Sequence, residues 1–549
     1  MPHNRMVTTP PPPPRLSFAG LVGAVGLGAL ALGPSLLPRA ALIAGLLVGV
    51  CAAIGYGVGA GTGWLVRRWR HVPQWRSSGT QRVWASVLCA AVIMAAAWWG
   101  WRAQVELAAL MEVPAPGPSW PLVAVGIGTA VLGGLLLIAR GVRTLTGWLR
   151  ERLQRVAPAP VATASALSVV ALVGLLAVGR APVALSTALN PLFQSMNAGT
   201  SPGLVQPSSA VVSGAPGSAV TWQSLGHDGR DFVGGVTPRP ALESFSGRPA
   251  KAPIRVYVGV DSSADDDQRA ALALRDLDTF GAWDRKVLAI GTSTGTGTVD
   301  EGEVTPLEYM YDGDVASVST QYSVLPSFLS FLVDGQNAQD AGRSLFDAVY
   351  SHWQQLPPDR RPQLVVFGES LGAFGGDAAF PDLADLATRT RGALFVGPPN
   401  GTQLWQTLTD DRQAGTPERL PVYGDGRQVR WADLPEDLAR PRSPWGPSRA
   451  VYLQNASDPV VWWSGDLLWA RPDWLAEPRG PDVLPSLTWL PLFTFAGLTG
   501  DMINSQGVPM GHGHVYGWHQ AAAWAQIMPP DGWTVADTRR LTTTLAATG

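Results

Sequence analysis

Hydrophobic and polar residues follow different patterns in the two parts of this chain of 549 residues. The part before about residue 190 contains five apolar stretches without interior charges: Leu16–Leu37, Ala41–Val66, Val83–Trp101, Leu122–Ile138 and Ala162–Val178. Each is close to the roughly 20 residues that a helix needs to cross the hydrocarbon core of a bilayer. Five such stretches in series are atypical of buried core helices or of a signal peptide. We therefore predict a transmembrane domain of about five helices over residues 16–185.

Arginine residues indicate how this domain is oriented. They gather in the loops after the second and fourth stretches: Arg67, Arg68, Arg70, Arg76, Arg82, Arg140, Arg143, Arg150, Arg152 and Arg155. The loop between the third and fourth stretches instead carries Arg102 with Glu106 and Glu112. Short loops rich in Lys and Arg stay in the cytoplasm. The proline-rich lead over 1–15 is therefore predicted to be cytoplasmic, and the chain after about residue 185 to lie outside the cytoplasm of a multi-pass membrane protein.

The pattern after residue 186 is that of a soluble domain. Residues 186–222 are rich in Ser, Gly, Pro and Ala, and we assign 186–240 to a linker that leads into the domain. Short apolar runs then follow: Ile254–Gly259, Lys286–Ile290, Leu364–Phe367, Ala393–Val396 and Ala450–Leu453. Helical patterns at Ala264–Phe280 and Ala338–Leu356 separate some of them. Alternation of strands and helices predicts an α/β fold with a mostly parallel sheet over 241–549.

Composition narrows the chemistry. The net charge of −2 gives no electrostatic reason to expect nucleic-acid binding. Both cysteines, Cys51 and Cys89, lie in the apolar part, so the soluble domain has neither a disulfide framework nor a zinc site with Cys ligands. We expect no metal and no cofactor.

A G-x-S-x-G motif at Gly368-Glu-Ser370-Leu-Gly372 is the strongest candidate for chemistry. A second match exists around Ser293, so the context has to separate the two. Ser370 directly follows a predicted strand and precedes small residues that lead toward a helix, as a nucleophile elbow requires. Ser293 is followed by Thr-Gly-Thr-Gly-Thr, which starts a helix poorly. We predict that Ser370 is a nucleophile; an ordinary glycine-rich turn is the alternative.

Candidate oxyanion donors follow from the same motif. In this type of site, one N–H comes from the residue after the serine, here Leu371. The other comes from a loop after an earlier strand, and the glycine-rich loop 291–297 has the right place in the chain order. Its candidate residues are Gly291, Thr292 and Gly295. A flexible surface turn is an equally good interpretation of this loop.

A base and an acid are found from chain order. The expected order is Ser, then Asp or Glu, then His near the C-terminus. His512 and His514 lie there, and we favour His514 because it is nearer the helix that follows; a solvated turn or a metal site is the alternative. Asp458 follows a predicted strand and could orient the imidazole. Asp501 is its rival, and an Asp-Pro pair can also simply start a turn.

A segment rich in aromatic residues separates Asp458 from the histidines. It contains Trp462, Trp463, Trp469, Trp474, Trp489, Phe493 and Phe495. A plain connection would be shorter. The segment is predicted to form a lid or a membrane-facing acyl pocket, or else a packed cap without lipid contact.

Several motifs together resemble those of the actinobacterial family of multi-pass membrane proteins with a C-terminal α/β-hydrolase domain. They are Pro38-Arg39, Tyr322–Ser327, Gly368–Gly372, Ser457–Pro459 with Trp462-Trp463, and Gly511–His514. The resemblance covers nearly the whole chain. It implies a serine-hydrolase fold and a triad of Ser370, Asp458 and one histidine of the His512/His514 pair. It implies no particular substrate.

These inferences favour a membrane-anchored serine hydrolase, esterase- or lipase-like, that cleaves a lipid or another acyl ester outside the cytoplasm through an acyl-enzyme. An acyltransferase that moves the acyl group to an envelope sugar or lipid alcohol is the alternative within the enzyme class. A non-catalytic transporter or receptor is a further alternative, although the apolar stretches lack the intramembrane ionisable residues typical of transport paths. The sequence does not indicate an oligomeric state.

Overall fold

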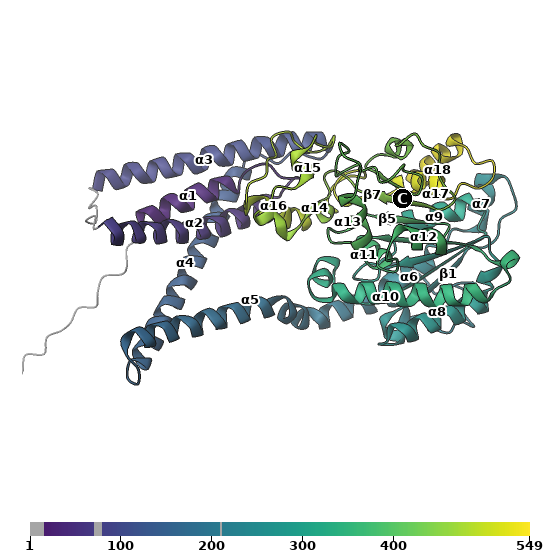
Figure 1. Ribbon diagram of the computed structural model, residues 1–549, viewed down its shortest axis with the longest axis horizontal. Helices are drawn as coiled ribbons and strands as arrows, with labels where there is room; N and C mark the ends of the chain where they lie inside the picture. The colour runs from purple at the N-terminus through teal and green to yellow at the C-terminus, as the bar shows by residue number, and fades with distance from the viewer. Residues whose placement is uncertain (1–15, 71–78, 209–210, 549) are drawn as a thin grey trace, which may run out of the picture. The chain divides into compact units, whose positions relative to one another are not determined.

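The computed structural model describes residues 16–70, 79–208 and 211–548 (Figure 1). The chain divides into two compact units, one of Met1–Ala109 with Pro114–Leu167, and one of Leu110–Val113 with Ser168–Gly549. The predicted cytoplasmic lead 1–15 lies outside the described residues.

The first unit is helical. Its elements are α1 (Phe18–Leu30), α2 (Ala41–Arg70), α3 (Gly79–Leu110), α4 (Trp120–Leu153) and the start of α5 (Ala159–Ala198). Among the described residues, four segments are long and apolar enough to cross a membrane: Ala41–Trp69, Val83–Leu110, Trp120–Leu153 and Ala159–Ala177. The first of the five predicted spans forms only the 13-residue helix α1. Pro34 follows shortly after it, and proline disfavours helical backbone at its own position and the one before.

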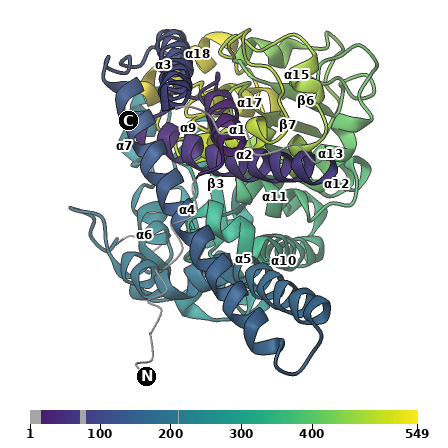
Figure 2. The same cartoon turned by 90° about the vertical axis from the view of Figure 1, so that its left-hand side faces the viewer.

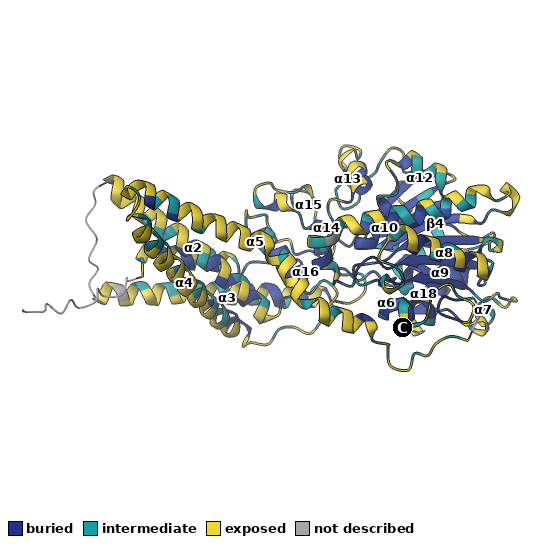
Figure 3. Cartoon of the chain, turned by 90° about the horizontal axis from the view of Figure 1, so that it is seen from below, coloured by how far each residue is buried: buried dark blue, intermediate teal, exposed yellow. Residues whose placement is uncertain are grey.

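Glycines let these apolar helices approach closely. A Cβ on Gly55 of α2 would lie 2.2 Å from the carbonyl oxygen of Gly23 in α1, and a Cβ on Gly49 would lie 2.9 Å from that of Gly128 in α4. Small residues at such contacts are typical of membrane helices, which associate by close packing. Exposed residues run along α2 to α5 (Figure 3), and they include large apolar side chains such as Leu122 and Leu175. This pattern suits a membrane-spanning region.

The second unit contains a parallel seven-stranded sheet, as the alternating pattern predicts. Its strands are β1 (Ile254–Val258), β2 (Val287–Thr292), β3 (Val315–Thr320), β4 (Gln363–Glu369), β5 (Gly392–Val396), β6 (Val429–Ala432) and β7 (Arg449–Leu453). Their order across the sheet is β1-β3-β2-β4-β5-β7-β6, and all neighbours are parallel. β3 and β6 have no counterpart among the predicted strands. A run of apolar residues does not mark β3, because its buried residues include Ser317 and Ser319.

Helices cover both faces of this sheet. Helices α8 (Asp266–Phe280), α10 (Ser327–Gln355) and α11 (Leu371–Asp377) pack next to one another on one face, and α9 (Glu301–Met310), α17 (His519–Ile527) and α18 (Val535–Thr548) on the other. Figure 2 shows the strands between these two groups. The remaining helices are α6 (Gly226–Gly234), α7 (Arg239–Ser246), α12 (Leu383–Arg389), α13 (Gln403–Asp410), α14 (Pro459–Trp462), α15 (Asp473–Ala476) and α16 (Phe493–Met502).

The segment 186–240 is more ordered than the predicted linker. Helix α5 continues to Ala198, α6 and the start of α7 follow, and Val212 forms a bridge with Arg255 of β1. Tertiary contacts order this segment. The Arg230 guanidinium donates a 3.0 Å hydrogen bond to the carbonyl of Asn197 at the end of α5. The carbonyls at a helix end need such partners.

Part of the aromatic segment after Asp458 forms a packed cap. Trp462 and Trp474 are buried, and their ring centroids lie 5.6 Å apart. Trp463 packs against Phe495, and Trp469 is exposed.

Candidate active site

Ser370 occupies a sharp turn between β4 and α11. Its backbone has φ 56° and ψ −121°, a conformation that costs a non-glycine residue about 1–3 kcal/mol. The surroundings hold it there, because the Ser370 N–H donates to the Val396 carbonyl at 2.8 Å. A Cβ on Gly372 would lie 2.2 Å from the Thr292 carbonyl oxygen, so this position of the motif admits only glycine. The turn has the geometry of a nucleophile elbow.

Leu371 is the first residue of α11, and the first N–H groups of a helix have no partner within it. Leu371 and Ser370 line the same cavity of about 380 Å³. The Leu371 N–H is thus a candidate oxyanion donor next to the serine.

The second predicted set of oxyanion donors does not form a free loop. Gly291 and Thr292 are the last residues of β2, where Gly291 pairs with Ser319 of β3 and with Phe367 of β4. The strand extends past Ile290 because both neighbouring strands continue alongside it. Gly295 packs against the start of α10, since a Cβ on it would lie 2.6 Å from the Leu325 carbonyl oxygen. Thr294, between them, lines the cavity.

His514 and Asp458 form a buried pair. The imidazole Nδ1 lies 2.7 Å from Asp458 Oδ2, and because a carboxylate only accepts, Nδ1 carries the proton. Two further donors hold the carboxylate: the Tyr516 hydroxyl at 2.6 Å and the Val460 N–H at 2.8 Å. This arrangement leaves the lone pair of His514 on Nε2. The sequence-predicted rival, Asp501, lies in α16.

His514 lines the same cavity as Ser370. Its Nε2 is buried and has no hydrogen-bond partner among the described residues, and it lies 4.0 Å from Glu369 Oε1. Ser370, Leu371 and His514 all line the cavity. An imidazole with a free lone pair beside a serine can act as a general base.

Carboxyl groups tune this histidine. Burial lowers the pKa of His514, but the negative charge of Asp458 and its hydrogen bond outweigh burial and raise the pKa to about 8. Burial, together with the charge of Asp300, raises the pKa of the Glu369 carboxyl to about 8. Two groups with pKa values near neutrality therefore flank Ser370, a pattern that marks functional sites.

His512 belongs to a separate pair. Its Nδ1 lies 3.0 Å from Asp482 Oδ2, and this hydrogen bond raises the pKa of His512. His512 does not line the cavity that contains Ser370. Of the two histidines in the motif, the structure therefore brings only His514 together with Ser370 and Asp458.

The second G-x-S-x-G match is not a site. Ser293 is fully buried, and its hydroxyl donates to the carbonyl of Thr320 at 2.9 Å. Its role in the structure is to link the ends of β2 and β3.

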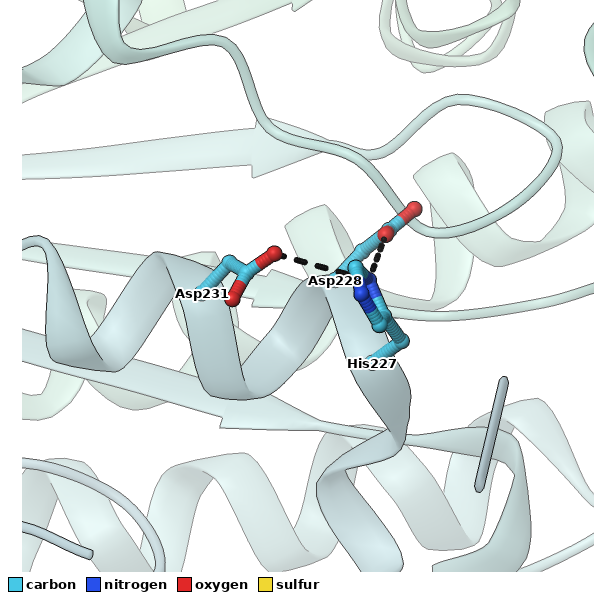
Figure 4. A group of neighbouring side chains, drawn as sticks. All are labelled: His227, Asp228 and Asp231. Atoms are coloured by element: carbon cyan, nitrogen blue, oxygen red, sulfur yellow. Dashed lines mark hydrogen bonds and ion pairs between the residues drawn. The ribbon is translucent and has the colours of Figure 1, made fainter. Parts of the chain in front are cut away.

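A group of candidate metal ligands is separate from the pair of His514 and Asp458. Among the described residues, His227, Asp228 and Asp231 of α6 are the group whose ligand atoms lie close enough to share an ion. Figure 4 shows the His227 ring between the two carboxylates, with Nδ1 at 2.9 Å from Asp228 and 3.4 Å from Asp231. The Nδ1 of His227 is thus used as a hydrogen-bond donor to a carboxylate.

Sequence reasoning missed several residues of the site. Glu369 lies within the Gly368–Gly372 motif and Tyr516 lies two residues after His514, but only the fold shows that Tyr516 holds Asp458 and that Glu369 lies near His514. Asp482, the partner of His512, carries no signal in the sequence.

Comparison with known proteins identifies the family. A family model described as the alpha/beta-hydrolase family matches residues 254–541, which is more than half of the chain. A second model, described as the N-terminus of the same family, matches residues 32–236. Neither the search of curated proteins nor that of solved structures finds a match. The chain belongs to the α/β-hydrolase family, and this membership supports a hydrolase-type function.

Proposed function

We propose that the protein is a membrane-anchored serine hydrolase that cleaves acyl esters through a triad of Ser370, His514 and Asp458. One observation carries the proposal: the strained serine and the unpartnered Nε2 of a carboxylate-bound imidazole line one cavity. Each feature also occurs alone elsewhere, as in the positive φ of Asp312 and the unpartnered Nδ1 of His519, so it is their combination around one cavity that supports the proposal.

The chemistry follows from the atoms. His514 Nε2 takes the hydroxyl proton as Ser370 Oγ attacks the ester carbonyl, and the Leu371 N–H stabilises the oxyanion. Asp458 keeps the proton on Nδ1 and stabilises the imidazolium that forms. The imidazolium then protonates the leaving alcohol, and water releases the acid from the acyl-enzyme by the same route.

The place of this reaction is the second part of the proposal. The N-terminal region holds four candidate membrane spans. The arginine-rich loops after the second and fourth apolar stretches support a cytoplasmic side for these loops, and hence a catalytic domain outside the cytoplasm. A substrate at the membrane, such as a lipid or another acyl ester, suits this placement.

The test is covalent labelling of the full-length protein in membranes with a fluorophosphonate probe, followed by peptide mapping. Labelling is expected on Ser370 and is expected to vanish in Ser370→Ala, which should also lose on the order of 10⁴-fold or more in esterase kcat. Ser293→Ala is the matched control, because it removes the serine of the other motif and should keep the label. Labelling of another residue, or none on folded protein, would refute the proposal.

A further inference from the structure

The segment that follows β2 presents a row of polar side chains to the catalytic cavity. Thr294, Thr296, Thr298 and Asp300 all line it, together with Ser370 and His514. The backbone turns here, because the Gly297 N–H donates to the Thr294 carbonyl at 3.1 Å and the Thr294 N–H donates to the Thr298 carbonyl at 2.9 Å, and this turn brings the side chains to one cavity. The Thr-Gly-Thr-Gly-Thr sequence therefore forms a wall of the cavity.

The intervening residues explain why this wall is fixed. A Cβ on Gly297 would lie 2.5 Å from the Tyr257 hydroxyl oxygen, and one on Gly295 would meet the Leu325 carbonyl oxygen. Gly297 also has a φ of 104°, which disfavours any side chain. The Tyr257 hydroxyl itself donates to the Gly297 carbonyl at 2.6 Å. Tight packing behind the two glycines thus turns the threonines toward the cavity.

The hydrogen bonds of the wall determine whether its hydroxyls can donate to a ligand or only accept from it. Thr298 Oγ1 donates its only proton to Asp228 Oδ2 at 2.7 Å, since a carboxylate only accepts. Thr296 Oγ1 lies 3.0 Å from Thr298 Oγ1, and because the Thr298 proton is already used, Thr296 is the donor in that pair. Asp228 is held in place in turn by His227 (Figure 4). Both hydroxyls therefore offer lone pairs, and no proton, to a ligand.

The Asp300 carboxyl extends this row of acceptors. Asp300 caps α9, and its Oδ1 accepts from the Gly302 N–H at 2.7 Å and from the Gln520 amide at 2.9 Å. Glu369 lines the cavity beside it. A wall of acceptors has few donors of its own, so its natural partner is a molecule with several O–H or N–H groups.

Other parts of the cavity have the opposite character. Phe328 and Phe331 come from the start of α10, and Trp463 and Met502 come from the aromatic cap. Such side chains suit an acyl chain. The cavity therefore joins an apolar lining to a hydrogen-bond-accepting wall around one serine.

We propose that the wall of Thr294, Thr296, Thr298 and Asp300 binds the alcohol part of the ester, and that this alcohol is polyhydroxylated, as a glycerol or a sugar is. The inference rests on the proposed function and names its substrate class. Attack by Ser370 Oγ forms the acyl-enzyme and breaks the bond between the carbonyl carbon and the alcohol oxygen, and His514 returns the proton to that oxygen. The wall holds the polyol while it leaves; a polyol acceptor would occupy the same wall in an acyl transfer.

The test compares two butyryl esters, monobutyryl glycerol and ethyl butyrate, with the full-length protein in detergent. The measured quantity is the ratio of kcat/KM for the glycerol ester to that for the ethyl ester. In Thr296→Val, which keeps the shape but removes the acceptor, this ratio is expected to fall about 3- to 10-fold, as the loss of one or two hydrogen bonds predicts. Thr296→Ser should restore it. Thr279→Val is the control, because this threonine is exposed on α8 and bonds only within its own helix.

Each outcome has a separate meaning. An unchanged ratio in Thr296→Val, with fluorophosphonate labelling still present, would overturn the polyol wall but leave the serine hydrolase intact. Failure of both esters and of the label in the unmodified protein would instead overturn the proposed function. Product analysis with added glycerol separates the two uses of the wall, since transfer to glycerol yields a new ester and hydrolysis yields only butyric acid.

Discussion

Asp458→Asn is the most direct test of how the site works. The substitution keeps the size of the side chain but removes the charge that faces His514 Nδ1 at 2.7 Å. The amide group can also turn its N–H₂ toward the ring, which would favour the tautomer with the proton on Nε2 and abolish the base.

The magnitude can be worked from this distance. Two unit charges 2.7 Å apart attract by about 6 kcal/mol at an effective dielectric constant of about 20. This attraction exists only after His514 has taken the serine proton, so its loss raises the barrier. At about 1.4 kcal/mol per tenfold in rate, the expected loss in kcat is on the order of 10⁴-fold. The same substitution in a serine-protease triad has an effect of about this size.

The assay is the hydrolysis of a short-chain nitrophenyl ester by the full-length protein, with thermal unfolding as the check on folding. Asp482→Asn is a matched control, because it alters the neighbouring Asp–His pair with the same chemistry. The control should lose less than about tenfold, since His512 does not line the cavity. The reasoning fails if Asp458→Asn keeps a tenth of the activity while folded, or if both variants lose activity equally.

Three further predictions concern pH and stability. Because His514 must be unprotonated to act as a base and its pKa is about 8, kcat/KM should fall about tenfold for each pH unit below about 8, as a pH–rate profile would show. Gly372→Ala should destabilise the fold by more than about 3 kcal/mol in chemical unfolding, because its Cβ would lie 2.2 Å from the Thr292 carbonyl oxygen. Arg255→Leu should cost about 3–5 kcal/mol, since it leaves the buried Glu308 carboxylate without the guanidinium that now lies 2.7 Å from it.

A specific outcome would contradict each of these three predictions. A rate that stays flat between pH 6 and 9 would show that the imidazole does not titrate as inferred. Gly465→Ala is the control for Gly372→Ala, because a Cβ on Gly465 meets nothing within 4 Å. Equal stability of the two glycine variants would contradict the packing argument. Replacing Arg255 and Glu308 together by apolar residues should restore part of the lost stability, since no unpaired charge then remains buried.

The segment 186–240 shows where composition misleads. Composition predicts a linker because Ser, Gly and Pro favour turns and loops. The segment is nevertheless ordered by contacts between residues that lie far apart in the sequence. The same argument applies to β3, whose serines are buried because parallel neighbours on both sides satisfy its backbone.

The sequence by itself determined the features that depend on neighbouring residues: the apolar helices, the alternation that predicts a parallel sheet, and a serine between a strand and a helix. Only the tertiary structure decided which histidine joins it. His512 and His514 lie two residues apart, and each has an aspartate partner from a distant part of the chain. The choice depends on the turn at Gly513, whose N–H donates to the Ser457 hydroxyl and whose carbonyl accepts from Asn455. Contacts across 30 residues for His512 and 56 residues for His514 orient the two rings, and no local pattern of hydrophobic and polar residues encodes them.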